Sequence, residues 1–458
     1  MLLIIILYII GIFIVDVQTM IFMLVVYVIG LGIGSLLNKT YKKDVLKIYS
    51  ILYTAGAAYM LTCYAYMTYH GYDYLFSPDI ASTFHPITQG YLSLGSYSNS
   101  LNDIWRSYAF LDRYQYGYFT YSTLFAFLGN IFNANFYIGQ NLSVLFLYSF
   151  VGVVLFKLLL INNIDKIKAY KNSLTICLFS IIFFYSFQTL RDIHILLLYL
   201  LAIYFTFKEN FSVANLLKLI LVIFICCTFR IESGLFLFVL IPTYLLLSLK
   251  NIKQRNYVLI ISLIVGVVFF SLVIPNYKSI DTVLNANQEN YVENVEKKGS
   301  GVISNLQKIP IAGNFISIIY NAVQPIPFWG RFTPELARST TLGKEVYNIM
   351  SFPLSIASFF NWFVIVYILF WLFSKGLREK TKDYISKPLH YQLWIGLFFL
   401  YLQSAVISQR RLMAYYCMFY ILFFIVYNHI SESDRKQITL TAILSFIALQ
   451  IIGLIYLS

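Results

Sequence analysis

The chain has 458 residues, of which 59% are hydrophobic and only 12% are charged. Soluble domains carry about 25% charged residues, so the composition excludes an ordinary soluble domain and predicts a polytopic membrane protein. The formal net charge is +13. Basic cytoplasmic loops give a membrane protein such a charge, which therefore requires no nucleic-acid partner.

The predicted elements are apolar runs, about 13 of which are long enough or nearly long enough to span a bilayer. These runs are 2–15, 20–37, 50–69, 136–160, 173–188, 193–207, 213–229, 233–249, 257–274, 351–373, 390–408, 412–429 and 437–457. The first run lacks a basic leader and a small-residue cleavage site, so we expect it to be a retained helix rather than a signal peptide. The expected fold is a single all-α membrane domain over residues 1–458.

One further run, 116–132 (YGYFTYSTLFAFLGNIF), is ambiguous, and the basic clusters decide how it is interpreted. These clusters lie at 38–47, 162–171, 208–209, 250–255, 375–387 and 431–436. Basic loops favour the cytoplasm, and all of these clusters can lie there only if 116–132 does not cross. We therefore expect a surface helix at 116–132 on the outer face, with the N-terminus inside and the C-terminus outside.

This layout leaves two long segments on the outer side, 71–135 and 275–350. The second includes an apolar stretch, 309–332, whose prolines and glycines predict half-helices on the membrane surface. The first collects ionisable residues, namely Asp73, Asp79, His85, Asp103, Arg106, Asp112 and Arg113.

Short outer turns carry arginines at the expected membrane boundary. The turns are TLRDIH (189–194), FRIES (229–233) and SQRRLM (408–413). Their arginines are Arg191, Arg230, Arg410 and Arg411. A structural interpretation is that these side chains end helices by extending to the interface, or form ion pairs such as Arg230 with Glu232. However, the positive-inside rule disfavours arginines on this side, so their recurrence favours a functional role.

Arginine is suited to bidentate contact with phosphate. An arginine cluster at the outer lipid boundary therefore predicts a site for a polyprenyl-phosphate or pyrophosphate headgroup. In this interpretation Arg191 contacts the phosphate, Asp192 orients it or a hydroxyl, and His194 lies one turn deeper for a hydrogen bond or proton transfer. The sequence contains no GxxxxGK[ST], GxGxxG, HExxH or CxxC motif.

The order of these features resembles the Wzy- and EpsG-type polysaccharide polymerases over roughly residues 50–430. The segments that carry the resemblance are YQYGYFTYSTLFAFLG, TLRDIHILLLYLLAIYFTFK, CCTFRIESGLFLFVLIP and SQRRLMAYYCMFYILFF. The layout is also similar to the GT-C group of polyprenyl-linked glycosyltransferases. That resemblance implies an acidic residue in the first long outer loop that serves as a base, and Asp79 and Asp73 are the nearest matches.

The first expectation is a glycosyltransferase that polymerises undecaprenyl-pyrophosphate-linked repeat units into O-antigen or capsular polysaccharide. Arg191, Arg230 and one of Arg410 and Arg411 would neutralise the leaving pyrophosphate, and His85 and Arg113 are further candidates for substrate binding. Asp79, Glu232 or His194 would accept the hydroxyl proton. We expect no metal and no cofactor.

Two alternatives remain. A transferase that uses a polyprenyl-phosphate sugar, or an O-antigen ligase, would use the same site, and a flippase for lipid-linked oligosaccharide belongs to another class. The expected partners are the lipid-linked donor and acceptor, membrane lipid and a chain-length regulator. The resemblance implies the bacterial inner membrane, with the active site facing the periplasm or the outside.

Overall fold

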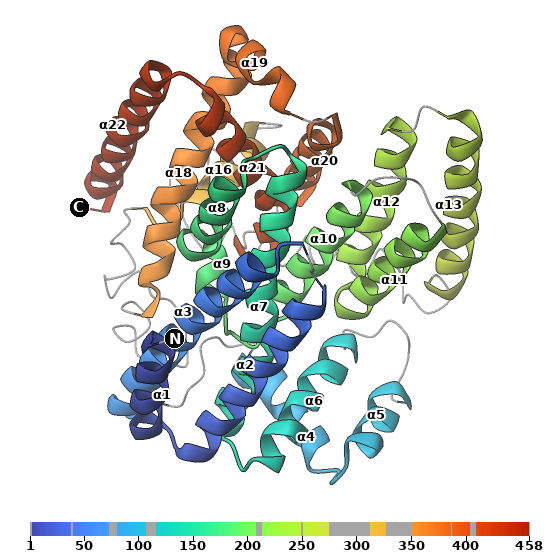
Figure 1. Ribbon diagram of the computed structural model, residues 1–458, viewed down its shortest axis with the longest axis vertical. Coiled ribbons are helices and arrows are strands. Elements are labelled where there is room, and N and C mark those ends of the chain that lie inside the picture. Colours follow the sequence, from blue (N-terminus) through green and yellow to red (C-terminus); the bar gives the residue numbers. More distant parts are fainter. Residues whose placement is uncertain are drawn as a thin grey trace.

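The structure is a computed structural model that describes most of the chain. The described residues are 2–37, 40–72, 80–106, 116–207, 213–248, 251–273, 312–326, 350–385, 387–403 and 409–457. They form helices and turns, with no strand among them (Figure 1). The all-helical prediction is therefore confirmed.

The helices of the first half of the chain range from 4 to 28 residues in length. They are α1 (Leu2–Ile14), α2 (Val17–Leu37), α3 (Lys42–Tyr69), η1 (Ile80–Phe84, a π-helix), α4 (His85–Leu92), α5 (Tyr97–Arg106), α6 (Tyr116–Ile131), α7 (Phe136–Ile161), α8 (Lys166–Phe179), α9 (Ile181–Phe184), α10 (Asp192–Phe207) and α11 (Val213–Phe229).

The second half is also helical where it is described. Its described helices are α12 (Ile231–Ser248), α13 (Ile252–Val273), α16 (Ala312–Val323), α18 (Phe352–Phe373), α19 (Lys375–Thr381), η4 (Lys382–Tyr384, a 3₁₀ turn), α20 (Lys387–Gln403), α21 (Gln409–His429) and α22 (Glu432–Leu457).

Five of the described helices contain a segment that is long and apolar enough to cross a membrane. These segments are Val17–Leu36, Phe136–Ile161, Phe352–Phe373, Leu412–His429 and Glu432–Ile455. Along α22, Leu440, Leu444, Ile447 and Ile451 are exposed at helical spacing, a stripe that lipid would cover and that water would not tolerate. The chain is thus an α-helical, multi-pass type of membrane protein, whereas the finer expectation of about 13 spans stays a prediction.

Helix α7 lies at the centre of the bundle and contacts α2, α3, α6, α8 and α10. Neighbouring helices approach α7 so closely that some of its positions require small residues. A Cβ at Gly152 would lie 2.2 Å from Leu52 Cδ1 on α3. Asn135 begins the helix as its N-cap, because its side-chain oxygen accepts hydrogen bonds from the backbone N–H groups of Tyr137 and Ile138. The central helix therefore provides a fixed reference for the helices packed around it.

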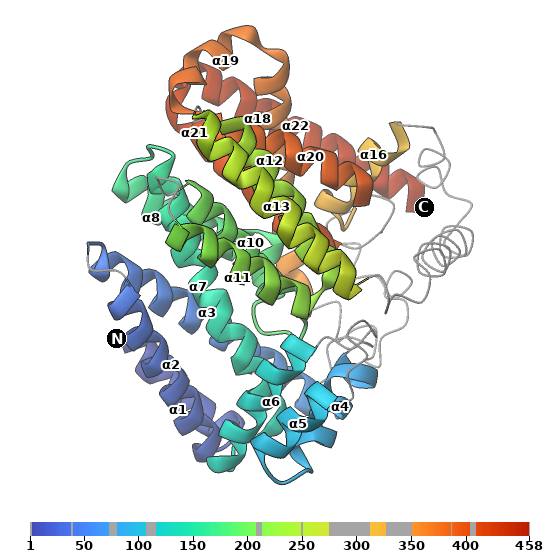
Figure 2. The ribbon, with the colours of Figure 1, turned by 90° about the vertical axis from the view of Figure 1, so that its right-hand side faces the viewer.

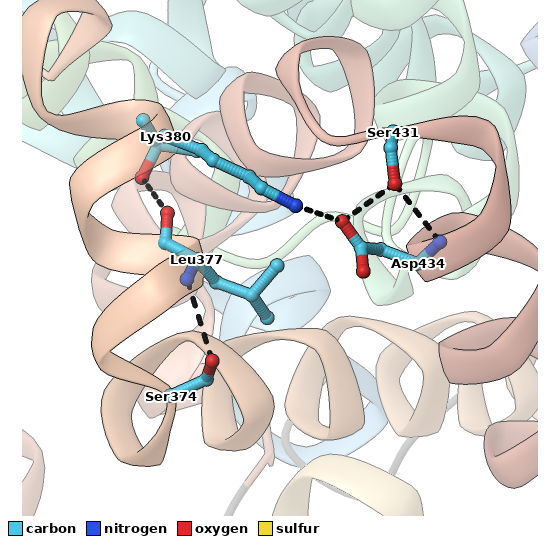
Figure 3. Close-up of polar contacts among 6 residues, drawn as sticks. Ser374, Leu377, Lys380, Ser431 and Asp434 are labelled. Atoms are coloured by element: carbon cyan, nitrogen blue, oxygen red, sulfur yellow. Dashed lines mark hydrogen bonds and ion pairs between the residues drawn. The ribbon is translucent and has the colours of Figure 1, made fainter.

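Basic clusters that were expected on one side of the membrane meet in pairs. Lys166 Nζ lies 2.8 Å from Asp44 Oδ2, which joins the start of α8 to the start of α3. Lys380 Nζ lies 2.6 Å from Asp434 Oδ2, which joins α19 to the capped start of α22 (Figure 3). In Figure 2 the turn between α2 and α3, the start of α8 and α19 lie on the upper and left-hand sides, whereas α4, α5 and the C-terminus lie on the lower and right-hand sides. Four of the six basic clusters thus lie toward these sides of the bundle. The side of the membrane that they face stays a prediction.

Helix α6 forms where a surface helix was expected at 116–132, and it is not among the helices that could cross a membrane. One face, including Tyr118, Phe119 and Ser122, is buried against neighbouring helices. It packs on α4, α5, α7 and α11. That α6 lies along the outer membrane face stays a prediction.

Helix α16 forms within the stretch 309–332 that was expected as half-helices on the membrane surface, and its end is bonded to α18. Its place relative to the membrane stays a prediction. Asn361 Nδ2 donates to the carbonyl of Ala322 over 2.6 Å, and Ser358 Oγ donates to the carbonyl of Val323. Both donors lie 6 to 9 residues into α18, about 9–14 Å along its axis at 1.5 Å per residue. Since α18 is itself a candidate span, the end of α16 reaches toward its middle. Hydrogen bonds from α18 satisfy two of the free carbonyls at the end of α16, those of Ala322 and Val323.

Candidate functional site

The first arginine lies in a buried, irregular segment between α9 and α10, residues 185–191, which we call the arginine turn. Thr189 and Leu190 are at most 3% exposed. Arg191 immediately precedes α10, and its carbonyl accepts a hydrogen bond from the N–H of Ile195. The expected turn TLRDIH (189–194) overlaps the end of this segment, where Thr189 and Leu190 are packed against protein. Its level relative to the membrane boundary stays a prediction.

The second arginine forms the whole connection between two helices. Arg230 is the single residue between α11 and α12, and its N–H donates to the carbonyl of Cys226. Gly234 permits this tight corner, because a Cβ there would lie 2.7 Å from the backbone nitrogen of Cys227. The corner therefore holds the base of the Arg230 side chain in one position.

The two segments meet. Arg230 Nη2 lies 2.9 Å from Asp192 Oδ1, and the side chains of these residues are 11% and 3% exposed. Arg191 Nη1 approaches the carbonyl oxygen of Phe229 at 3.5 Å. Within the described residues, Arg230 Nε is buried and has no hydrogen-bond partner. The structure thus brings together Arg191, Asp192 and Arg230, three of the residues singled out from the sequence.

The ion pair joins two of the residues expected at the phosphate site. The structural interpretation of these turns paired Arg230 with Glu232; Arg230 pairs with Asp192 here, and the Glu232 side chain lies outside the described part of the chain. A buried ion pair loses much hydration energy, and breaking it leaves an uncompensated charge. Because Asp192 balances one arginine, the trio keeps a formal charge of +1. An anion that approached it would meet a guanidinium whose Nε–H has no acceptor among the described residues.

His194 lies one helical turn further along α10 and is enclosed by aromatic rings. Its ring stacks on Phe229 with a centroid distance of 5.0 Å, and Tyr118 and Tyr121 meet it edge-on at 5.4 and 5.2 Å. It is 2% exposed, and neither ring nitrogen has a hydrogen-bond partner among the described residues. The enclosure separates this imidazole from solvent.

His85, a candidate substrate-binding residue, contacts the arginine turn instead of an open space. His85 Nε2 lies 2.9 Å from Thr189 Oγ1, and Tyr118 OH donates to the carbonyl of Thr189 over 3.0 Å. Burial lowers the pKa of His85 to about 4, since desolvation disfavours the imidazolium. Two helices from segment 71–135, α4 and α6, thus hold Thr189, which lies two positions before Arg191.

No family model, curated protein or solved structure matches this chain.

The remaining predicted site residues are described only in part. Glu232 lies in the first turn of α12, and Arg410 and Arg411 lie in the first turn of α21. Helix α21 packs on α10, which begins at the arginine turn. Asp79 and Arg113 lie outside the described residues, as do Asp73 and Asp112.

Two further features bear on ligand binding. Among the described residues, no group of three or more His, Cys, Asp or Glu residues could hold a metal ion. A crevice of about 40 Å³ lies between the end of α6 and the start of α7, lined in part by Asn130 and Asn135. Its volume suffices for one or two water molecules but not for a sugar, and its lining does not include the arginines.

Sequence reasoning missed Thr189, Tyr118 and Tyr121, which contact the arginine turn or His194. Thr189 stands in the quoted motif TLRDIH, but a threonine at a helix start is ordinarily interpreted as a cap. The two tyrosines lie three residues apart on α6 and therefore share one face, which was a usable signal for a paired contact.

Proposed function

We propose that this protein is a membrane glycosyltransferase that polymerises repeat units carried on undecaprenyl pyrophosphate. The observation that supports it best is the pairing of Arg230 with Asp192 beside Arg191, with Arg230 Nε buried and without an acceptor among the described residues. Arginines from two separate segments thus lie close together. A pyrophosphate provides several oxygens that could accept from both.

In the proposed reaction a hydroxyl oxygen of the acceptor repeat unit attacks the anomeric carbon of the donor glycan. The new glycosidic bond forms as the bond between that carbon and the pyrophosphate oxygen breaks. Undecaprenyl pyrophosphate leaves with the electron pair, and Arg191 and Arg230 stabilise its negative charge. Arg410 or Arg411 would add a further cation.

The hydroxyl proton passes to a base. Of the candidates His194, Glu232 and Asp79, His194 is enclosed by three rings. A general base must come within hydrogen-bond reach of the proton that it accepts. We therefore favour the two carboxylates for this role.

The proposal includes the cellular location and the membrane topology that the sequence suggests. The enzyme would lie in the bacterial inner membrane with about 13 spans, in a GT-C-like layout with its site on the periplasmic or outer side. A chain-length regulator would be its protein partner. Two pairs of basic clusters, which lie on the upper and left-hand sides in Figure 2, support this orientation.

The direct test is the product formed by the purified full-length protein in liposomes that contain a synthetic lipid-linked repeat unit. The proposal predicts a ladder of products with regular spacing and the release of undecaprenyl pyrophosphate. A single added sugar, or transfer to a lipid A core, would instead indicate the alternative transferase or ligase. Unchanged substrate would contradict all three.

A flippase for lipid-linked oligosaccharide is favoured by one specific observation. The end of α16 meets Ser358 and Asn361 toward the middle of α18, and broken helices at such depth form the substrate sites of many transporters. The same liposomes separate the two functions. A flippase would move a fluorescent lipid-linked repeat unit between leaflets without lengthening it.

A further inference from the structure

We propose that His85 and Tyr118 are positioning residues that fix the arginine turn and thereby the direction of Arg191. This inference rests on the proposed function, in which Arg191 binds a pyrophosphate and must therefore point in the right direction. It concerns residues that would not touch the substrate. Both come from the first long outer segment, on α4 and α6.

The contacts converge on one residue. Thr189 offers its hydroxyl to His85 Nε2 at 2.9 Å and its carbonyl to Tyr118 OH at 3.0 Å. The side chains of all three residues are nearly or fully buried, at 4%, 0% and 1% exposure for His85, Tyr118 and Thr189. Water cannot readily replace hydrogen bonds in such a place, so they restrain the backbone more strongly than exposed ones.

These helices are in turn anchored to the centre of the bundle. Thr88 Oγ1 on α4 lies 3.3 Å from Ser122 Oγ on α6, and Ser122 Oγ is hydrogen-bonded to Gln140 Oε1 on α7. Gln140 Nε2 donates back to the carbonyl of Ser122 over 3.0 Å. A continuous chain of contacts therefore links α7 to Thr189 through α6 and α4.

Helix α6 also contacts the far side of the turn. The Tyr118 ring meets His194 on α10, and Gly117 lies so close to Thr228 on α11 that a Cβ there would approach the Thr228 side chain to 2.0 Å. A shift of α6 would therefore move the starting point of Arg191 relative to Arg230. Misplacement of a positioned group by about 1 Å can cost about 100-fold in rate.

A matched pair of tyrosines tests the inference. Tyr118 and Tyr121 both lie on α6, both rings contact His194, and each hydroxyl donates to a backbone carbonyl over 3.0 Å. Only Tyr118 bonds to the arginine turn, since the acceptor of Tyr121 is Ser143 on α7. Tyr118→Phe and Tyr121→Phe thus remove equivalent bonds with different consequences.

The first measurement is the affinity of the full-length protein in detergent for inorganic pyrophosphate, from the shift of its thermal midpoint with pyrophosphate concentration. The Tyr118→Phe variant loses one hydrogen bond and should therefore bind pyrophosphate roughly 2- to 10-fold more weakly than the wild type. The Tyr121→Phe variant should bind pyrophosphate like the wild type. Thr189→Val should weaken binding as well, and Thr189→Ser should restore it because the hydroxyl for His85 is kept. Equal affinity of the two tyrosine variants would overturn the inference and leave the proposed function standing.

The second measurement keeps the two ideas separable. Backbone hydrogen exchange in residues 185–195 should become faster in Tyr118→Phe but not in Tyr121→Phe. If the wild type does not bind pyrophosphate, the proposed site fails, and exchange alone decides whether the two residues hold the turn. Equal exchange in both variants would contradict the positioning role.

Discussion

At the residue scale, variants of the ion pair between Arg230 and Asp192 allow an effect on stability to be distinguished from an effect on activity. Both side chains are largely buried, so Arg230→Ala removes one partner of a buried ion pair and should destabilise the protein by about 3–5 kcal/mol. The double substitution Asp192→Asn with Arg230→Gln removes both charges and should recover most of that loss. Chemical denaturation in detergent measures both variants.

The double variant is informative because it should regain stability without regaining activity. If Arg230 binds the leaving pyrophosphate, the refolded double variant should remain inactive in the liposome assay. Full polymer production by this variant would show that Arg230 serves only to hold Asp192 and the starts of α10 and α12 together.

A second prediction at this scale concerns pH. Burial lowers the pKa of His85 to about 4, whereas histidine in an unfolded chain titrates near pH 6.5. Between these values the unfolded chain binds the extra proton, so the stabilising effect of neutral His85 is complete above about pH 6.5 and is lost as the pH falls toward about 4. The groups around the ring, Thr189, Phe136 and Tyr137, carry no charge.

The loss should amount to a free energy of unfolding on the order of 3 kcal/mol. Thermal midpoints recorded from pH 7 to pH 4.5 measure it, and His85→Gln should flatten the curve. His70 is exposed at the end of α3, and His70→Gln serves as the control that should keep the wild-type slope. A wild-type slope in His85→Gln would argue against the titration of this group.

At the element scale, the contact between α6 and α11 depends on a single glycine. A Cβ at Gly117 would lie 2.0 Å from Thr228 Oγ1 and 3.0 Å from the backbone carbon of Thr228. The hydroxyl could turn away but the backbone could not, so Gly117→Ala should separate the helices and cost about 1–3 kcal/mol. Gly32 on α2 has no atom within 4 Å of an added Cβ, so Gly32→Ala is the matched control. Equal thermal midpoints for the two variants would contradict the tight contact.

The ends of several helices show what hydropathy can and cannot predict. The apolar runs 50–69, 173–188 and 437–457 all lie in or near helices, but α3, α8 and α22 begin earlier, at Lys42, Lys166 and Glu432. Charged first turns continue a helix beyond the lipid, and caps such as Asp165 and Ser431 stabilise them. Apolar length therefore predicted that these helices exist, but not where they start.

The arginine turn shows that a break in regular structure can be absent from the sequence pattern. Nothing in the sequence IIFFYSF marks a break, yet α9 ends at Phe184 and the chain stays irregular to Arg191. Tertiary hydrogen bonds from His85 and Tyr118 hold this segment, and their partners lie 104 and 71 positions apart along the chain. Residue types and charge placement identified Arg191, Asp192 and Arg230 as a group, but the pairing within the group depended on the fold.

At the scale of the whole molecule, the account requires that α4 and α5 lie on the side opposite α19. Exposed positions suitable for labelling are Ser98 on α5 and Lys375 on α19, whose side chain is 84% exposed. The native cysteines are buried, except that Cys227 is half-buried, so introduced cysteines should dominate the labelling. In intact cells an impermeant maleimide should modify Ser98→Cys and should reach Lys375→Cys only after the membrane is permeabilised. Modification of both from outside would overturn the orientation.

The measurement that tests the central claim most directly is the glycan length distribution made by Arg191→Ala and Arg191→Lys beside the wild type. Arg191 is the better target, because its substitution does not leave the buried Asp192 without Arg230. Charge-assisted hydrogen bonds are worth about 1.5–3 kcal/mol, so losing one to the leaving pyrophosphate should slow turnover roughly 10- to 150-fold. The account predicts single repeat units and no ladder for Arg191→Ala at wild-type protein levels, and a partial ladder for Arg191→Lys, which keeps the charge but loses the planar fork. An intact ladder from Arg191→Ala would contradict the pyrophosphate site and leave these arginines with a structural role only.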